Sequence, residues 1–199
     1  MTQYRVLVHR DVLQYLRTLE RAASTQQPGG LRDRELRALR AGLRALANGE
    51  EEHFEGKRLG FTTHDLSDCA EIKLPVIPES RGNRELGSSH RLIYREFESD
   101  DGGPPYREVV CFEHRGGNRP FEVAAKRLGR AVGVRRLTLN TLGASSDIAP
   151  IRQPLPADLR KALASASDVA LASGAVRAGP PAQQPRTAPG RGTSPGREL

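Results

Sequence analysis

The sequence predicts a single α+β domain over residues 1–130, in which helices come first and an antiparallel sheet follows. Leucines recur at helical spacing in two early segments. Three later segments alternate apolar and polar residues, and loops rich in Gly, Pro, Ser and Asp separate them. A block of helices followed by a block of strands is typical of α+β folds, so we expect the helices to cover one face of the sheet.

A strand and a helical hairpin form the first half of the predicted domain. Residues 4–8 alternate and contain Val and Leu, which favours a strand. Apolar residues at helical spacing follow in two groups, which are Val12, Leu13, Tyr15, Leu16 and Leu19, then Leu36, Leu39, Leu43 and Leu46. The turn signals "STQQPGG" and Asn48-Gly49 end these segments. The pattern predicts two antiparallel helices.

A three-stranded meander and a short helix form the second half. The predicted strands are "CAEIKLPVI" (69–77), "HRLIYREFE" (90–98) and "YREVVCFEH" (106–114), and the predicted helix covers residues 121–130. Alternate residues of a strand share a face. The residues expected to face the helices are Ile72, Leu74, Val76, Leu92, Tyr94, Val110 and Phe112, together with His90 and His114 as structural histidines. A bulge at "HRGG" would instead turn His114 to the other face. The residues expected on the opposite, charged face are Glu71, Lys73, Arg91 and Arg115.

The rest of the chain carries most of the net charge of +7 and no strong core signal. We expect an extension over residues 131–173 with an Ala-rich helix at 157–173, then a disordered tail rich in Pro, Gly and Arg over residues 174–199. After residue 128 bases outnumber acids ten to four, whereas the preceding charges nearly balance. A polyanion site in the folded domain must therefore be a local cluster of cations.

Several kinds of protein are excluded by features that the sequence lacks. No segment approaches the roughly 20 apolar residues of a membrane span, so we expect a cytoplasmic protein. Cys69 and Cys111 are too few for a disulfide framework and predict buried thiols. No His or Cys pair has metal spacing, no Gly-rich phosphate loop precedes a helix, and no nucleophile elbow occurs. We therefore expect no metal and no cofactor.

The predicted charged face allows two interpretations. Half-exposed antiparallel sheets usually have a polar outer face, on which opposite charges of neighbouring strands contribute only about 0.2–1 kcal/mol per pair. Alternatively, the face binds a phosphate, because Arg115 opens a Gly-Gly-Asn-Arg loop whose backbone amides would form an anion nest. Arginine suits this role because its planar group binds a phosphate through two hydrogen bonds.

Three phrases follow one another in a specific order, "LSDCAEIKL", "HRLIYREF" and "EHRGGNRPFEVAAKRL". With the order of strand, helical hairpin, meander and short helix, residues 3–130 resemble the RelE/ParE superfamily of bacterial toxins, and the RelE-like branch more than the gyrase-poisoning ParE branch. The resemblance implies a RelE-like β-α-α-β-β-β fold with a short C-terminal helix. It also implies a toxin that cuts mRNA in the ribosomal A site without a metal ion. The implied partners are a cognate antitoxin protein, the ribosome and mRNA, and no membrane.

The resemblance carries three catalytic residues over to this chain. Lys73 matches the second basic position of the family's second strand, Arg91 the arginine that opens the third, and Arg115 the arginine that ends the fourth. At two positions the chain departs from the family pattern. Glu71 stands where a lysine is expected, and Phe121 stands where the C-terminal tyrosine is expected. Phenylalanine stacks on a base but transfers no proton.

RNA cleavage without a metal needs a base for the ribose 2′-hydroxyl, cations for the charge on phosphorus, and an acid for the leaving 5′-oxygen. As a hypothesis, Glu71 is the general base, and Lys73 and Arg91 hold the phosphate. Arg115 would stabilise the transition state, and the acid is unassigned. The residues expected to bind substrate around this set are Arg95, Arg119 and Phe121.

The alternative function is a binding toxin of the same fold without nuclease activity, such as a DNA gyrase poison. Phe121 favours this alternative because the residue that would transfer a proton is missing. Lys73, Arg91 and Arg115 together favour the nuclease, because a protein-docking surface has no need of all three.

Overall fold

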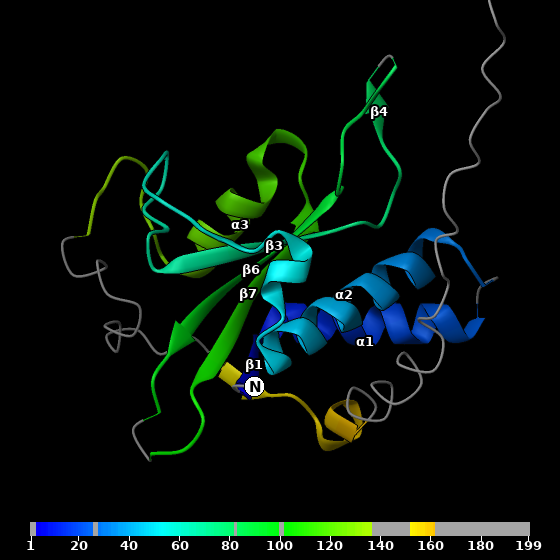
Figure 1. Ribbon diagram of the computed structural model, residues 1–199, viewed down its shortest axis with the longest axis horizontal. Coiled ribbons are helices and arrows are strands. Elements are labelled where there is room, and N and C mark those ends of the chain that lie inside the picture. The colour runs from blue at the N-terminus through cyan, green and yellow to red at the C-terminus, as the bar shows by residue number, and fades with distance from the viewer. Residues whose placement is uncertain (1–2, 26–27, 82, 100–101, 137–151, 162–199) are drawn as a thin grey trace, which may run out of the picture.

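The computed structural model describes residues 3–25, 28–81, 83–99, 102–136 and 152–161. Its centre is a mixed six-stranded sheet in the order β2-β3-β6-β7-β1-β8 (Figure 1). The strands are β1 (Arg5–His9), β2 (Lys57–Arg58), β3 (Cys69–Leu74), β6 (His90–Phe97), β7 (Tyr106–His114) and β8 (Arg152–Pro154). β1 runs parallel to β7, and the other neighbouring strands are antiparallel. The fold is therefore α+β with a mixed sheet.

The helical hairpin predicted from the apolar spacing is confirmed. It consists of α1 (Arg10–Thr25) and α2 (Leu31–Asn48), and eight of the nine predicted apolar positions are buried, whereas Tyr15 is only partly buried against the core. Gly49 ends α2 in the left-handed conformation, with φ of 73°, and its amide donates to the carbonyl of Ala45. Glycine adopts this conformation without steric cost, which explains why the helix stops there.

A second helix layer covers the other face of the sheet. The helix predicted at residues 121–130 is observed as α3 (Arg119–Arg127), and Figure 1 shows it across the sheet from α1 and α2. Beneath it lies a second, smaller core made of Leu66, Cys69, Ile93, Val110, Cys111, Ala124 and Ala125. Because α3 covers the middle of this face, the charged surface expected there is confined to one end of the strands.

The predicted orientation of Val110 is wrong. The pairing of β6 with β7 shifts register between Ile93 and Tyr94, so that Tyr94 lies opposite Val109. This β-bulge reverses the alternation along β7, since an extra residue moves each preceding side chain to the other face. Val109 therefore packs in the hairpin core, whereas Val110 lies under α3.

The segment after the domain contributes to the core, contrary to expectation. β8 pairs antiparallel with β1, and residues 157–161 form a helical turn. Leu155 and Leu159, at 4% and 5% exposure, belong to the core under the helical hairpin. The structured part therefore extends beyond residue 130. The rest of the predicted Ala-rich helix, 162–173, and the predicted tail, 174–199, lie outside the described residues.

A buried arginine fastens the connection that leads from α2 into the sheet. The guanidinium of Arg107 donates to the carbonyl of Leu46 at 3.1 Å and to the carboxylate of Glu51 at 2.7 and 2.8 Å. It also donates to Glu96 at 2.9 Å and lies 3.5 Å from the centre of the Tyr4 ring. Glu51 begins a short 3-10 helix, η1 (Glu51–Phe54), which leads into β2. Arg107 thus positions the segment that brings Glu55 and Lys57 to the sheet.

The two cysteines are buried free thiols, as the sequence predicts. Burial raises the pKa of Cys111 to about 12 and that of Cys69 well above its usual value, so both stay protonated. No helix in the described part of the chain is long and apolar enough to cross a membrane.

Candidate functional site

The predicted cations meet on the face of the sheet that carries α3, at the end of the strands that α3 leaves uncovered. Lys73 lies opposite Arg91 across β3 and β6, and Arg91 lies opposite Glu113 across β6 and β7. Arg115 follows two residues after Glu113, and its backbone amide donates to the carbonyl of Ser89 at 2.9 Å. Three cations that are distant along the chain, Lys73, Arg91 and Arg115, therefore share one end of the sheet, and together they form the cation cluster.

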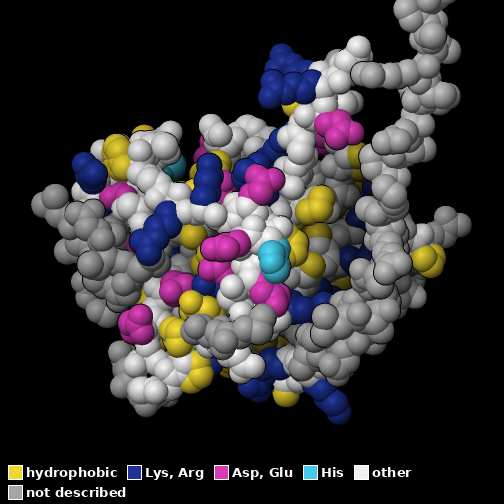
Figure 2. Space-filling view, in the orientation of Figure 1, with side chains coloured by type: hydrophobic (Ala, Val, Ile, Leu, Met, Phe, Trp, Pro, Cys, Tyr) yellow, Lys and Arg dark blue, Asp and Glu magenta, His cyan; other side chains and the backbone are white. Residues whose placement is uncertain are grey.

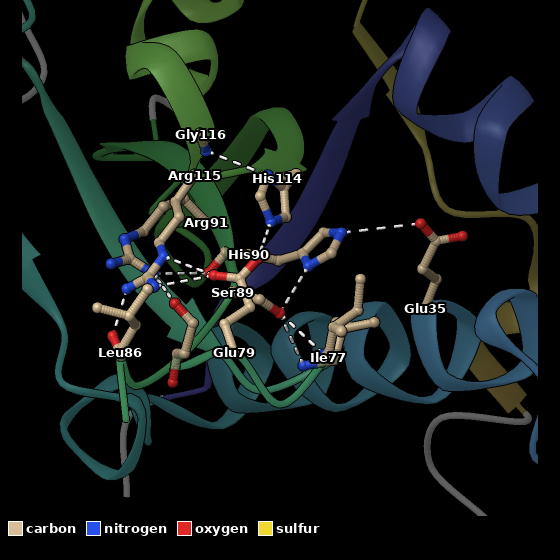
Figure 3. A network of polar contacts seen from close by, with 12 residues as sticks. Glu35, Ile77, Glu79, Leu86, Ser89, His90, Arg91, His114, Arg115 and Gly116 are labelled. Carbon is tan, nitrogen blue, oxygen red and sulfur yellow. Dashed lines mark hydrogen bonds and ion pairs between the residues drawn. The ribbon is translucent and has the colours of Figure 1, made fainter. Parts of the chain in front are cut away.

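Arg91 and Arg115 lie close enough to influence each other's charge. Figure 3 shows their guanidinium groups side by side, with Glu79 beside them. Burial is the main cause that lowers the pKa of Arg91; Glu71 opposes it, and the positive charge of Arg115 adds to it. Two neighbouring guanidinium groups that both stay charged can bind one phosphate together once their carboxylate partners are displaced.

Each predicted cation is accompanied by a carboxylate. Lys73 bonds to Glu55, Arg91 lies 3.5 Å from Glu71, and Arg115 bonds to Glu79 at 2.8 and 3.1 Å. Figure 2 shows the same mixture on a larger scale, with Lys and Arg side chains interspersed with Asp and Glu. Glu55 and Glu79 sit on loops at the surface, and bonds from Lys73 and from His114 and Arg115 lower their pKa values. A phosphate that enters the site must replace these two carboxylates.

Glu71 does not lie where a general base must lie. Its side chain is 3% exposed, and its carboxylate lies between Lys57 Nζ at 3.4 Å and Arg91 Nε at 3.5 Å. β2, which sequence patterns do not reveal because it has two residues, pairs with β3 at this position and covers the carboxylate. The assignment of Glu71 as the base is therefore not supported. Its geometry is that of a residue that positions Arg91 and Lys57.

His114 and Glu79 form an accessible pair that the sequence analysis did not assign. The amide of Gly116 donates to Nδ1 of His114 at 3.1 Å, so Nε2 carries the proton that is donated to Glu79. A Cβ atom at position 116 would lie 3.1 Å from the same Nδ1, so a larger residue there would push the His114 ring aside by a few tenths of an ångström. Because the Gly116 amide is used in this way, that part of the predicted phosphate nest is already occupied.

His90 is a structural histidine, as predicted. Its ring stacks on Phe112 with centres 5.2 Å apart, its Nδ1 lies 3.0 Å from Ser89 Oγ, and its Nε2 lies 3.7 Å from Glu35. His114 lies directly opposite His90 and points the same way, as predicted, but its ring is half-exposed and lies edge-on to His90. The two rings, Glu79 and Arg115 form the continuous polar network of Figure 3.

Burial of His90 predicts a loss of stability at mildly acidic pH. Burial lowers its pKa below the usual 6.5, and the charge of His114 acts the same way, whereas Glu35 and Glu79 oppose it. The unfolded chain then takes up a proton more readily than the folded one, so stability is present above pH 6.5 and is lost as the pH falls below it. The free energy of unfolding, measured with urea, should change less between pH 7.5 and about 5.5 for His90→Gln than for the wild type. An unchanged difference would assign the effect to other groups, such as His9.

The three residues expected to bind substrate lie in different surroundings. Arg119 is 68% exposed and 3.1 Å from Glu113, near the cation cluster. Phe121 packs partly against the second core and lines a cavity beside β2. The prediction that Arg95 binds substrate is wrong, because its side chain is 3% exposed and bonds to Glu108 and Asp68 beneath the sheet surface. A guanidinium that is sealed between two carboxylates holds the fold together and does not contact a substrate.

Neither a protein-family model, nor a curated protein, nor a solved structure matches this chain. Among the described residues, no group of three or more His, Cys, Asp or Glu side chains is arranged to hold a metal ion. The functional assignment therefore depends on the geometry of the cation cluster and on the resemblance in sequence.

Proposed function

We propose that this protein is a RelE-like toxin that cuts mRNA on the ribosome. The observation that carries the proposal is the convergence of Lys73, Arg91 and Arg115 at one end of three adjacent strands, each partly exposed. The order of elements, with the first strand parallel to the last strand of the meander, fits the expected β-α-α-β-β-β arrangement. A cluster of this kind matches a phosphodiester whose charge increases during cleavage.

In the proposed reaction the 2′-oxygen of a ribose attacks the adjacent phosphorus, and the bond to the 5′-oxygen breaks. Lys73 and Arg91 hold the phosphate, and Arg115 stabilises the additional negative charge of the transition state. RNA phosphates take the place of Glu55 on Lys73 and of Glu79 on Arg115, while Glu79 keeps its bond to His114. His114 and Glu79, which lie next to Arg115, are the groups that take the proton from the 2′-hydroxyl and deliver one to the 5′-oxygen.

The proposal is tested by mapping mRNA ends in a translation reaction with purified ribosomes. The wild-type protein should produce breaks at codons within ribosomes, and the same mRNA without ribosomes should stay intact. Primer extension locates the breaks. If translation continues and the mRNA remains whole, while DNA supercoiling by gyrase fails, the nuclease proposal is wrong and the poison is the correct function.

Replacing Glu71 with glutamine tests its role independently. As a positioning residue it should lower the rate of cleavage less than tenfold, and the dependence of the rate on pH should keep its shape. A general base would lose the acidic limb of the pH profile when it is replaced by glutamine. Loss of that limb in Glu71→Gln would restore the original hypothesis.

A binding toxin is the second candidate, and one observation favours it. All three cations are matched by carboxylates within the chain, so the surface is close to neutral and resembles one that docks a protein with mixed charges. In that case neither ribosome-bound nor free mRNA would be cut.

A further inference from the structure

A cavity of about 340 Å³ opens beside the cation cluster, between the segment that follows β2 and the start of α3. Its walls include Lys57 and Leu59 from the β2 side, Thr62, Thr63 and His64 from the following loop, and Phe121 from α3. Pockets for small ligands hold about 300–1,000 Å³, so this one accepts a single small planar group and excludes a duplex. The sequence analysis did not predict it.

The cavity is joined to the cation cluster through one shared carboxylate. Lys57 Nζ and Arg91 Nε lie 3.4 and 3.5 Å from the two oxygens of Glu71. Lys57 is therefore a fourth cation next to Arg91, its side chain is 62% exposed, and it also lines the cavity. Positive groups thus continue from Arg115 through Arg91 to the mouth of the cavity, as expected of a surface that follows a nucleic-acid backbone.

The walls of the cavity suit a base better than a phosphate. Phe121 and Leu59 offer apolar surface, and an aromatic ring stacks on any base. Nδ1 of His64 lies 3.2 Å from the carbonyl of Arg130, which only accepts, so Nδ1 carries the proton and Nε2 is an acceptor. Arg58 and Glu122 also line the cavity, and the carboxylate of Glu122 accepts from the amino groups of adenine, cytosine or guanine.

The loop that forms one wall is held in place by backbone bonds. Leu59 donates to Cys69 at 2.9 Å, and Gly133 donates to Thr63 at 2.9 Å. The amide of Arg136 donates to the side chain of Asp65 at 2.8 Å. A wall fixed in this way is ordered before the ligand arrives, which reduces the entropy lost on binding.

We propose that this cavity binds one unstacked base of a single-stranded RNA whose phosphate lies on the cation cluster. The inference rests on the proposed function, because it treats the cluster as a phosphate site. It assigns base stacking to Phe121 and a phosphate contact to Lys57, and it predicts preference for bases with an amino group over uracil. Phe121, which cannot replace the family's tyrosine in proton transfer, would then keep a role in binding.

The test is fluorescence anisotropy with a labelled eight-nucleotide RNA whose riboses are 2′-O-methylated, so that the probe cannot be cleaved. Phe121→Leu, which keeps an apolar side chain, should weaken binding about 5–100-fold. Lys57→Gln should reduce the slope of log K against log salt by about 0.7. Arg17→Gln, an exposed change on α1 across the sheet, is the matched control and should bind as the wild type does.

An abasic nucleotide at each probe position in turn supplies the decisive arm. At one position, the abasic probe should bind the wild type about as weakly as the intact probe binds Phe121→Leu. Removing the base at that position should not weaken binding to Phe121→Leu any further. Equal binding of all abasic probes, or displacement of RNA by an acidic peptide with no effect of Phe121→Leu, would overturn the proposal. If the variants and abasic probes behave as expected but ribosome-bound mRNA stays whole, the base site is supported and the nuclease proposal is wrong. If mRNA is cut but the variants and abasic probes have no effect on binding, only the base-site proposal is wrong.

Discussion

Replacing Arg115 with alanine is expected to slow cleavage of ribosome-bound mRNA by about 10²–10³-fold. Loss of one donor that stabilises developing charge typically costs about 2.7–4 kcal/mol of transition-state free energy. Arg115 is the best probe of the cluster because its partner Glu79 is partly exposed, so the change leaves no buried charge behind. Arg91→Ala is less informative, since it removes a partner of the buried Glu71 and is expected to lower stability as well.

Two further variants separate chemistry from folding. Arg115→Lys keeps the positive charge but loses the planar group that bonds to a phosphate in two places, so an intermediate rate is expected. Arg17→Ala removes an exposed arginine of α1 and should cut at the wild-type rate. The measurement is the initial rate of mRNA cleavage, accompanied by a melting curve for each variant. A folded Arg115→Ala protein that cuts normally would remove Arg115 from the catalytic set.

The helical hairpin and the strand positions could be predicted because their signals are local. The leucines that recur at helical spacing in α1 and α2 mark the buried face of each helix, and alternation along β3 and β6 marks two faces. The same alternation correctly placed Lys73 and Arg91 on one face of the sheet, and the structure adds that they lie directly opposite each other. It failed at Val110, because a bulge inserts one residue without leaving a pattern in the sequence.

The partners of the cations could not be predicted because they come from loops and short strands. Glu55 follows a 3-10 helix, Glu79 precedes the two-residue strand β4 (Ser80–Arg81), and Lys57 lies in the two-residue strand β2. The positions of these side chains depend on contacts between residues that are distant in sequence, such as those of Arg107 with Glu51. Strand alternation therefore predicts the cations of the site, but the carboxylates that balance their charge become known only from the tertiary structure.

Replacing Arg95 with methionine is expected to lower the free energy of unfolding by about 3–5 kcal/mol, with little effect on the binding of RNA. Arg95 is 3% exposed and donates to Glu108 at 2.6 and 3.1 Å, while Asp68 lies 3.3 Å away. The charges of Glu108 and Asp68 raise the pKa of Arg95 above its usual value, against the effect of burial. Removing one member of a buried ion pair leaves the other charge in a poorly solvated place.

The size of this effect can be checked by combining the change with a second one. When Arg95 is lost, Asp68 keeps Arg130 at 2.6 Å, whereas Glu108 loses the two hydrogen bonds that Arg95 donates. Arg95→Met with Glu108→Leu should regain most of the stability, because well-packed apolar residues commonly replace a buried pair at little cost. Thermal melting should show a fall of about 10 °C or more for the single variant, and Arg17→Met should melt as the wild type does. A single variant that melts normally but binds RNA more weakly would return Arg95 to the substrate site, since only a guanidinium that reaches the surface could act in that way.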